Sequence, residues 1–247
     1  MMNTATSVPR VNSAARALAI LVEVAGSAQG LTAKELSERL GISRQTVYHL
    51  VHTLAGEGFL ARGVGRTYRL GLRVGTLAHG FARQLASPES YLPQLRALVT
   101  ETGEAAYVSG WRDDEIAMFG QLRGEHAVSV SELHIGLMVD AHARAAGKLL
   151  LAYASAATRN EYLRAHPARR RTASTIEPAA LEHEFDSIRS QGFAADLEEF
   201  QAGVCCLAAP LDGGASPFAV SLSAPTERFR RNYDAYVRAI QKVASGV

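Results

Sequence analysis

Apolar residues recur with helical spacing over the first 55 residues of the chain and predict three helices. The first helix is predicted over residues 13–25, ends at Gly26 and turns one apolar stripe toward a core. That stripe consists of Leu18, Leu21, Val22 and Ala25. The second helix is short, because Thr32 and Glu35 have the spacing of a capping box at its start and Gly41 follows its end.

A third helix follows a tight turn, and Ser43 is placed to cap its start. Its apolar positions are Val47, Leu50, Val51 and Leu54. The opposite side carries side chains that form hydrogen bonds, which suits contact with base edges or phosphates. We therefore expect a DNA-recognition helix that uses Ser43, Arg44, Gln45, Thr46, Tyr48, His49 and His52.

Two strand-like runs, residues 58–62 and 66–70, come directly after the third helix. They bracket Gly63-Val64-Gly65, a sequence typical of a hairpin turn. Arg62 and Arg66 make the tip of this hairpin basic. Three helices followed by a basic hairpin describe a winged helix, in which the two arginines are expected to contact the DNA backbone or the minor groove.

The remainder of the chain reads as a linker helix followed by a mixed α+β domain. Strands with turn residues between them favour a largely antiparallel sheet. The expected strands lie near residues 105–111, 115–122, 192–196, 204–210 and 218–223, and the expected helices near 91–99, 141–154, 181–191 and from 230. The predicted organisation is a winged helix-turn-helix DNA-binding domain over 1–71, a linker helix and dimer contact over 72–88, and a second domain over 89–247.

Charge is distributed unevenly between these parts. The chain has 247 residues, 26 Lys and Arg, 24 Asp and Glu, and a net charge of +2. Residues 1–86 carry a net charge of +6 and the remainder carries −4. This asymmetry indicates a polyanionic partner for the first part only.

Composition excludes several classes of protein. Hydrophobic residues make up 47% of the chain, which is typical of a globular protein, and charged residues interrupt every candidate membrane span. The N-terminus has no secretory signal pattern, so we expect a cytoplasmic protein. The only cysteines, Cys205 and Cys206, are adjacent, and neither they nor the scattered histidines form a zinc motif. We expect no metal and no resident cofactor.

Several motifs together resemble the isocitrate lyase regulator (IclR) family over nearly the whole chain. They are Ser43 to Leu50, Tyr68 to Gly71, His142 to Lys148, Asp196 to Pro210 and Ser221 to Pro225. The resemblance implies a GAF-like α/β effector-binding domain in a dimeric or tetrameric transcription factor that binds small organic acids. The implied effector site comprises Arg144, Ala145, Asp196, Cys206, Ser221 and Ser223. Arg144 and Cys205 depart from common family patterns.

The chemistry of such a pocket suits a carboxylate. Ser221 and Ser223 are two residues apart on one strand and share a face. Backbone amides at Ala145 begin a helix and favour an anion. Arg144, turned inward, would form a bidentate pair with a carboxylate and favour a larger or aromatic acid.

The same residues also have purely structural interpretations. Cys206 is then a small buried hydrophobe, and Asp196 and the two serines satisfy neighbouring backbone. His142 then packs or caps its helix, and Lys148 forms a surface ion pair. The run Arg169-Arg170-Arg171 is interpreted as a solvated loop, with contact with a partner subunit as the alternative.

Three functions follow from these patterns. The leading prediction is a regulator, not an enzyme, that binds a palindromic double-stranded DNA operator as a homodimer or a dimer of dimers and responds to a small carboxylate. One alternative is a small hydrolase with Cys206 as nucleophile, His142 as base and Asp196 as orienting residue. The other is a winged-helix module that binds protein.

Overall fold

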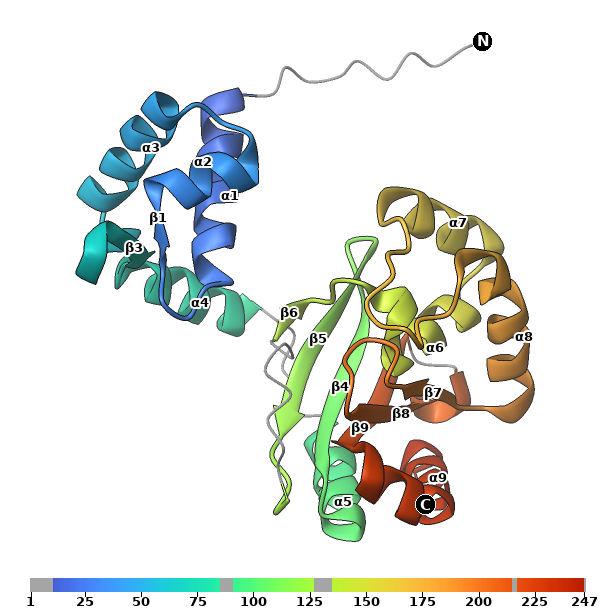
Figure 1. The fold of residues 1–247 in the computed structure, drawn as a ribbon. Coiled ribbons are helices and arrows are strands. Elements are labelled where there is room, and N and C mark those ends of the chain that lie inside the picture. Colours follow the sequence, from blue (N-terminus) through green and yellow to red (C-terminus); the bar gives the residue numbers. More distant parts are fainter. Residues whose placement is uncertain (1–10, 85–90, 127–134, 215–216, 247) are drawn as a thin grey trace. The chain divides into compact units, whose positions relative to one another are not determined.

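A computed structural model of the chain describes residues 11–84, 91–126, 135–214 and 217–246. These residues form two compact units, Met1–Leu85 and Ala86–Val247 (Figure 1). The predicted fold class is confirmed: a helix-turn-helix domain precedes an α/β domain with an antiparallel sheet.

The first unit packs its helices against a small sheet in the order β1-β3-β2. Its core gathers side chains from all three predicted helices and from the strands, including Ile20, Leu36, Val47 and Leu60. The elements are α1 (Asn12–Ala25), β1 (Leu31–Thr32), α2 (Ala33–Leu40), α3 (Arg44–Gly56), β2 (Leu60–Arg62), η1 (Val64–Arg66), β3 (Thr67–Leu70) and α4 (Arg73–Gln84).

The capping residues predicted for α2 and α3 are confirmed. The Thr32 side chain accepts a hydrogen bond from the backbone amide of Glu35, and the Glu35 carboxylate accepts one from the amide of Thr32. Gly41 ends α2 with a φ of 63°, where a side chain would be strained. Ser43 Oγ accepts a hydrogen bond from the amide of Thr46 at the start of α3. Local chemistry therefore sets the turn between the two helices.

The predicted buried stripe of α1 is wrong at Leu18, Val22 and Ala25, which are exposed, whereas its fourth residue, Leu21, packs against the core. Ile20 and Val24 are buried, whereas Leu18 and Val22 are 63% and 72% exposed. The sequence holds two overlapping stripes with identical helical spacing, and the one through Ile20 and Val24 faces the core. Periodicity alone cannot separate two such stripes, because both are apolar.

The second unit is built on a six-stranded sheet in the order β6-β5-β4-β9-β8-β7, with every neighbouring pair antiparallel. Helices α5 and α9 cover one face and α6, with α7 and α8, covers the other (Figure 1). The elements are α5 (Leu92–Thr102), β4 (Ala105–Arg112), β5 (Glu115–Leu122), β6 (Gly136–Leu137), η3 (Ala141–Ala143), α6 (Ala145–Tyr153), α7 (Ala156–Ala165), η4 (Pro178–Ala180), α8 (Leu181–Gln191), β7 (Ala194–Leu197), β8 (Val204–Pro210), η5 (Leu211–Gly214), β9 (Phe218–Pro225) and α9 (Thr226–Ala244).

Three helices of this unit differ from the sequence prediction. The helix predicted over 141–154 is interrupted at Arg144, whose extended backbone separates η3 from α6. Helix α9 begins at Thr226, directly after Pro225, and not near residue 230. Helix α7 was not predicted, since its polar sequence has little amphipathic pattern.

Candidate DNA-binding surface and effector pocket

Helix α3 turns the predicted polar face to solvent. Arg44, Gln45, Tyr48, His49 and His52 are all exposed, on the side away from the buried positions Val47, Val51 and Leu54. The other two predicted residues, Ser43 and Thr46, form the N-terminal cap of the helix. Ser43 Oγ lies 2.9 Å from the Thr46 hydroxyl and 3.2 Å from the Thr46 amide.

The hairpin places the two predicted arginines beside that helix. Arg62 and Arg66 are exposed, and the tip bends through positive φ angles at Gly65 and Arg66. One concave surface is lined by Tyr48 of α3, by both hairpin arginines and by Lys34 of α2. Lys34 was not predicted as part of this surface, although its position in the basic segment is a signal that favours it. The concave surface joins α3 and the hairpin into one basic face.

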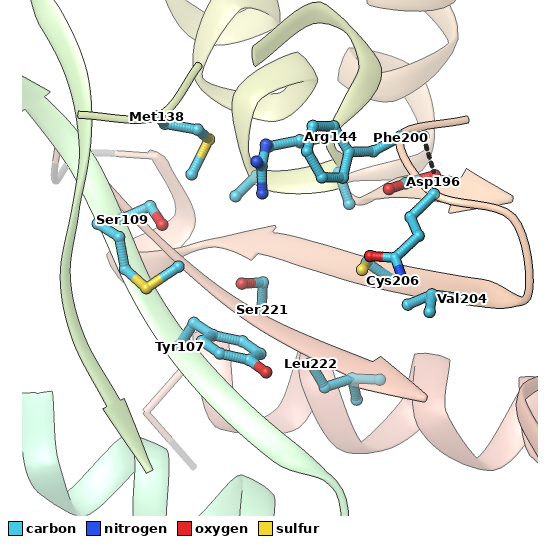
Figure 2. Close-up of a pocket in the computed structure, with 14 residues that line it drawn as sticks. Tyr107, Ser109, Met138, Arg144, Asp196, Phe200, Val204, Cys206, Ser221 and Leu222 are labelled. Atoms are coloured by element: carbon cyan, nitrogen blue, oxygen red, sulfur yellow. Dashed lines mark hydrogen bonds between the residues drawn. The ribbon is translucent and has the colours of Figure 1, made fainter. Parts of the chain in front are cut away.

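A pocket lies in the second unit between the sheet and the start of α6 (Figure 2). It is lined by five of the six residues predicted for effector binding. They are Arg144, Ala145, Asp196, Cys206 and Ser221. The register across the sheet explains this grouping, because Asp196 pairs with Cys206 and so shares its face.

Ser223, the sixth predicted residue, does not line the pocket but contacts a residue that does. Its hydroxyl oxygen lies 2.9 Å from the phenol oxygen of Tyr107, and Tyr107 lines the pocket. Burial raises the pKa of Tyr107, with the Ser223 hydrogen bond acting in the opposite direction. Ser223 therefore acts on the pocket by holding the Tyr107 ring.

The side chain of Arg144 is turned inward and buried. Its guanidinium carbon lies 3.4 Å from the ring centre of Phe200, and its Nε donates a hydrogen bond to the carbonyl of Val139 at 3.0 Å. Arg171 lies 4.6 Å from the same ring and pairs with Asp140 at 3.5 Å. Arg171 remains an exposed loop residue, as predicted, while its guanidinium also contacts the Phe200 ring and Asp140.

The volume left open in this pocket is small, about 30 Å³. That space holds one or two water molecules. Arg144 and Phe200 both line this space, and Figure 2 shows their side chains next to each other. A larger ligand therefore requires side chains to move.

Asp196 is held in a buried turn at the far side of the pocket. Its Oδ1 accepts hydrogen bonds from the amides of Glu199 at 2.7 Å and Phe200 at 3.3 Å. Burial raises the pKa of Asp196 to about 6, although these bonds and the nearby Lys148 lower it. The carboxylate thus orders the turn that carries Phe200.

Lys148 of α6 is 0% exposed, which corrects the reading of a surface ion pair. Its Nζ lies 2.5 Å from Glu199 and 2.9 Å from Glu184 of α8. Burial raises the pKa of Glu199 to about 7, against the opposing effect of Lys148. This ion cluster ties α6, α8 and the turn after β7 together beneath the pocket.

Two of the three residues of the hydrolase alternative, His142 and Cys206, are in surroundings that disfavour nucleophilic catalysis. The His142 ring is buried, and its Nε2 lies 2.9 Å from the carbonyl oxygen of Arg169. Burial raises the pKa of the Cys206 thiol well above its ordinary value, which disfavours the nucleophilic thiolate.

Several lining residues were missed by sequence reasoning. They are Tyr107, Ser109, Met118, Met138, Ala146, Phe200, Gln201, Val204 and Leu222. Tyr107 and Ser109 alternate on an otherwise apolar strand, a signal that places both on one face. Met118 joins them only because the β4–β5 register shifts at Val108/Ser109 and leaves Phe119 unpaired. Such a bulge has no clear sequence signature.

No helix in the described part of the chain is long and apolar enough to cross a bilayer. Within the same four described ranges, no group of three or more His, Cys, Asp or Glu side chains is placed to hold a metal ion.

A winged helix joined to a ligand-pocket domain defines a class, the effector-responsive transcriptional regulators. Two family models match this chain: the IclR helix-turn-helix domain over residues 13–63 and the bacterial transcriptional regulator IclR C-terminal domain over residues 84–247. The chain therefore belongs to the IclR family of transcriptional regulators.

Individual relatives agree with this assignment. The HTH-type transcriptional regulator BhcR of Paracoccus denitrificans is 32% identical over 242 residues, covering 94% of this chain and 86% of the relative. An IclR regulator from Alicyclobacillus acidocaldarius has a similar fold, with a TM-score of 0.72, 22% identity and coverage of 96% and 98% of the two chains. An IclR homologue from Microbacterium hydrocarbonoxydans, complexed with 4-hydroxybenzoate, gives a TM-score of 0.69 with 24% identity and coverage of 95% and 96%.

Proposed function

We propose that the pocket of the second unit binds a small organic acid and that this binding changes the affinity of the regulator for its DNA operator. The observation that carries the proposal is the inward, buried guanidinium of Arg144 at the start of α6. Guanidinium groups bind carboxylates through two parallel hydrogen bonds, and the first amides of a helix add a favourable dipole. Ala145, Asp196, Cys206, Ser221 and, through Tyr107, Ser223 complete the proposed site.

The apolar lining favours an acid with an aromatic or other apolar body. Met118, Met138, Phe200 and Val204 supply that lining, and pockets of this kind bury most of a ligand against apolar side chains. The homologue that carries 4-hydroxybenzoate supports an aromatic acid. Since only about 30 Å³ is open, entry of a ring requires side chains of the lining to move.

We propose that residues 1–71 bind the operator, that residues 72–88 form a linker and that residues 89–247 bind the effector. The exposed face of α3 would contact bases or phosphates through Arg44, Gln45, Tyr48, His49 and His52. Ser43 and Thr46 would fix the start of this helix. The hairpin would contact the DNA backbone or the minor groove through Arg62 and Arg66. The side chains of Leu72, Leu77 and Phe81 are exposed on or beside α4, which supports a homodimer contact; residues 85–88 of the linker lie outside the described residues. A dimer, alone or as a dimer of dimers, would require a palindromic operator.

The experiment is a DNA-binding measurement with and without acid. The purified chain selects its operator from genomic fragments, and fluorescence anisotropy then follows operator binding as benzoate or 4-hydroxybenzoate is added. We expect a palindromic operator whose affinity shifts at least fivefold with acid, because a ligand that favours one state must shift the equilibrium. Unchanged affinity across both acids, with no heat of binding in calorimetry, would contradict the proposal.

We propose no catalytic role for Cys206 and no resident cofactor. The contact of His142 with Arg169 and the raised pKa of the thiol support the first of these two statements. A regulator that binds chromosomal DNA must be in the same compartment as that DNA, which supports a cytoplasmic protein. Cys206→Ser would abolish turnover in a hydrolase, whereas in a regulator it would change acid affinity only.

A further inference from the structure

Two polar atoms of the pocket have no hydrogen-bond partner among the described residues. They are the Ser109 hydroxyl oxygen and the Gln201 side-chain oxygen, and both residues line the pocket. Ser109 is 0% exposed. Buried polar atoms are nearly always paired in native proteins, so an unpaired pair in one binding pocket points to groups on a ligand.

The two atoms lie at different ends of the pocket floor. Ser109 is on β4, whereas Gln201 follows β7 in the turn that Asp196 orders. The carbonyl of Gln201 accepts a hydrogen bond from the amide of Val204, so Gln201 lies at the start of β8. On β9, Ser109 pairs with Ala219 and Val204 pairs with Pro225, six residues further along, which separates the two positions by about 20 Å at the ordinary rise per residue. One small group on a ligand therefore cannot satisfy both atoms.

Their chemistry is also different. The amide oxygen of Gln201 only accepts hydrogen bonds, so its partner must carry an O–H or N–H. A carboxylate cannot fill that role. The Ser109 hydroxyl can donate to an anion, and Figure 2 shows the Arg144 guanidinium directed toward the Met138 and Ser109 side of the pocket.

From this arrangement, and resting on the proposed function, we propose that Ser109 and Gln201 determine effector specificity. Ser109 donates to the carboxylate that Arg144 binds, and Gln201 accepts from a hydroxyl at the opposite end of the effector. The effector class is then a hydroxy acid with its two polar ends separated by an apolar ring or chain, which contacts Met118 and Val204.

The test compares matched acids on matched variants by calorimetry. The probes are 4-hydroxybenzoate and benzoate, which differ only in the hydroxyl. The unmodified protein is expected to bind 4-hydroxybenzoate about tenfold more tightly, the usual effect of one buried hydrogen bond. Gln201→Met keeps the side-chain length and removes the acceptor, so it is expected to erase this preference and leave benzoate affinity unchanged.

Ser109→Ala gives a different expected result. It weakens both acids by about the same factor, because both carry the carboxylate. It does not lower the thermal midpoint of the ligand-free protein, because the hydroxyl has no partner to lose. Gln241→Met and Ser190→Ala, both on exposed helix positions, serve as matched controls and change neither affinity.

Three outcomes overturn the inference. Equal binding of the two acids shows that no hydroxyl is read, and an equal loss of both acids in Gln201→Met shows that Gln201 only packs. Destabilisation of the ligand-free protein by Ser109→Ala shows that the hydroxyl pairs within the protein or with bound water. Each of these leaves acid binding intact, whereas failure of both acids to bind contradicts the proposed function itself.

Discussion

The guanidinium of Arg144 stacks on the ring of Phe200, with 3.4 Å between the guanidinium carbon and the ring centre. The two residues come from different parts of the unit, the start of α6 and the turn after β7. A planar guanidinium stacks in this way and a lysine ammonium does not. The stack therefore positions a cation over the pocket floor.

Arg144→Lys is expected to weaken binding of benzoate and 4-hydroxybenzoate by about 10- to 100-fold. The substitution keeps the charge but loses the two parallel hydrogen bonds, and hydrogen bonds to charged groups contribute about 1.5–3 kcal/mol. Calorimetry measures the loss, and ligand-free operator affinity is expected to stay constant. Arg164→Lys, on the exposed face of α7, is the control. Full acid affinity in Arg144→Lys would show that the two parallel guanidinium hydrogen bonds do not contribute to binding.

Lys148→Met is expected to destabilise the second unit by about 3–5 kcal/mol, because it leaves Glu199 buried without its cation. The double variant Lys148→Met/Glu199→Gln is expected to recover part of that loss. Urea unfolding followed by fluorescence of Trp111, the only tryptophan, reports on this unit alone. Lys242→Met breaks an exposed ion pair and should cost under about 1 kcal/mol. Equal effects of the two lysine substitutions would contradict the role of the buried cluster.

The buried carboxyl of Asp196 makes the stability of the second unit pH-dependent. Its pKa is about 6 in the folded protein against 3.8 for the unfolded chain, because burial disfavours the anion. Between these values the folded state holds more protons, so this contribution is present below pH 3.8 and is lost as pH rises through 6. The free energy of unfolding falls by at most about 3 kcal/mol through this group. Glu199, whose pKa is also raised by burial, makes the free energy of unfolding fall with rising pH in the same way.

Asp196→Asn mimics the protonated acid and keeps an oxygen for the amides of Glu199 and Phe200. Unfolding free energies of both proteins, measured from pH 4 to 7, are expected to converge at pH 4. The variant is expected to become the more stable protein as pH rises. Parallel profiles would show that Asp196 titrates normally.

Features encoded by neighbouring residues could be predicted from the sequence. The cap at Thr32 and strand β8 lie where the pattern places them, because each depends on side chains close in the chain. The burial of Lys148 could not be predicted, since its partners Glu184 and Glu199 are brought to it only by the fold. The same holds for Tyr107, whose role depends on the pairing of β4 with β9.

Ser43→Ala is expected to destabilise the first unit by about 1 kcal/mol. The substitution removes the acceptor for the Thr46 amide at the first turn of α3. Circular dichroism measures the thermal midpoint, and Ser43→Asp, which can cap, is expected to restore it. Operator affinity should fall with Ser43→Ala as the helix start frays. Equal stability of the Ala and Asp variants would show that the cap does not contribute.

The exposed arginines of the first unit are expected to divide into two kinds of DNA contact. Arg44→Ala on α3 is expected to cost about 1–3 kcal/mol on the operator and to relax specificity at one base pair, because a base contact is lost. Arg66→Ala on the hairpin is expected to weaken all DNA sequences alike and to lower the slope of log affinity against log salt by about one. Anisotropy titrations over a salt series measure both effects, with Arg164→Ala as the control. If Arg44→Ala changes the salt dependence of affinity without loss of sequence specificity, Arg44 contacts a phosphate. Gln45 and its neighbours on α3 would then make the base contacts.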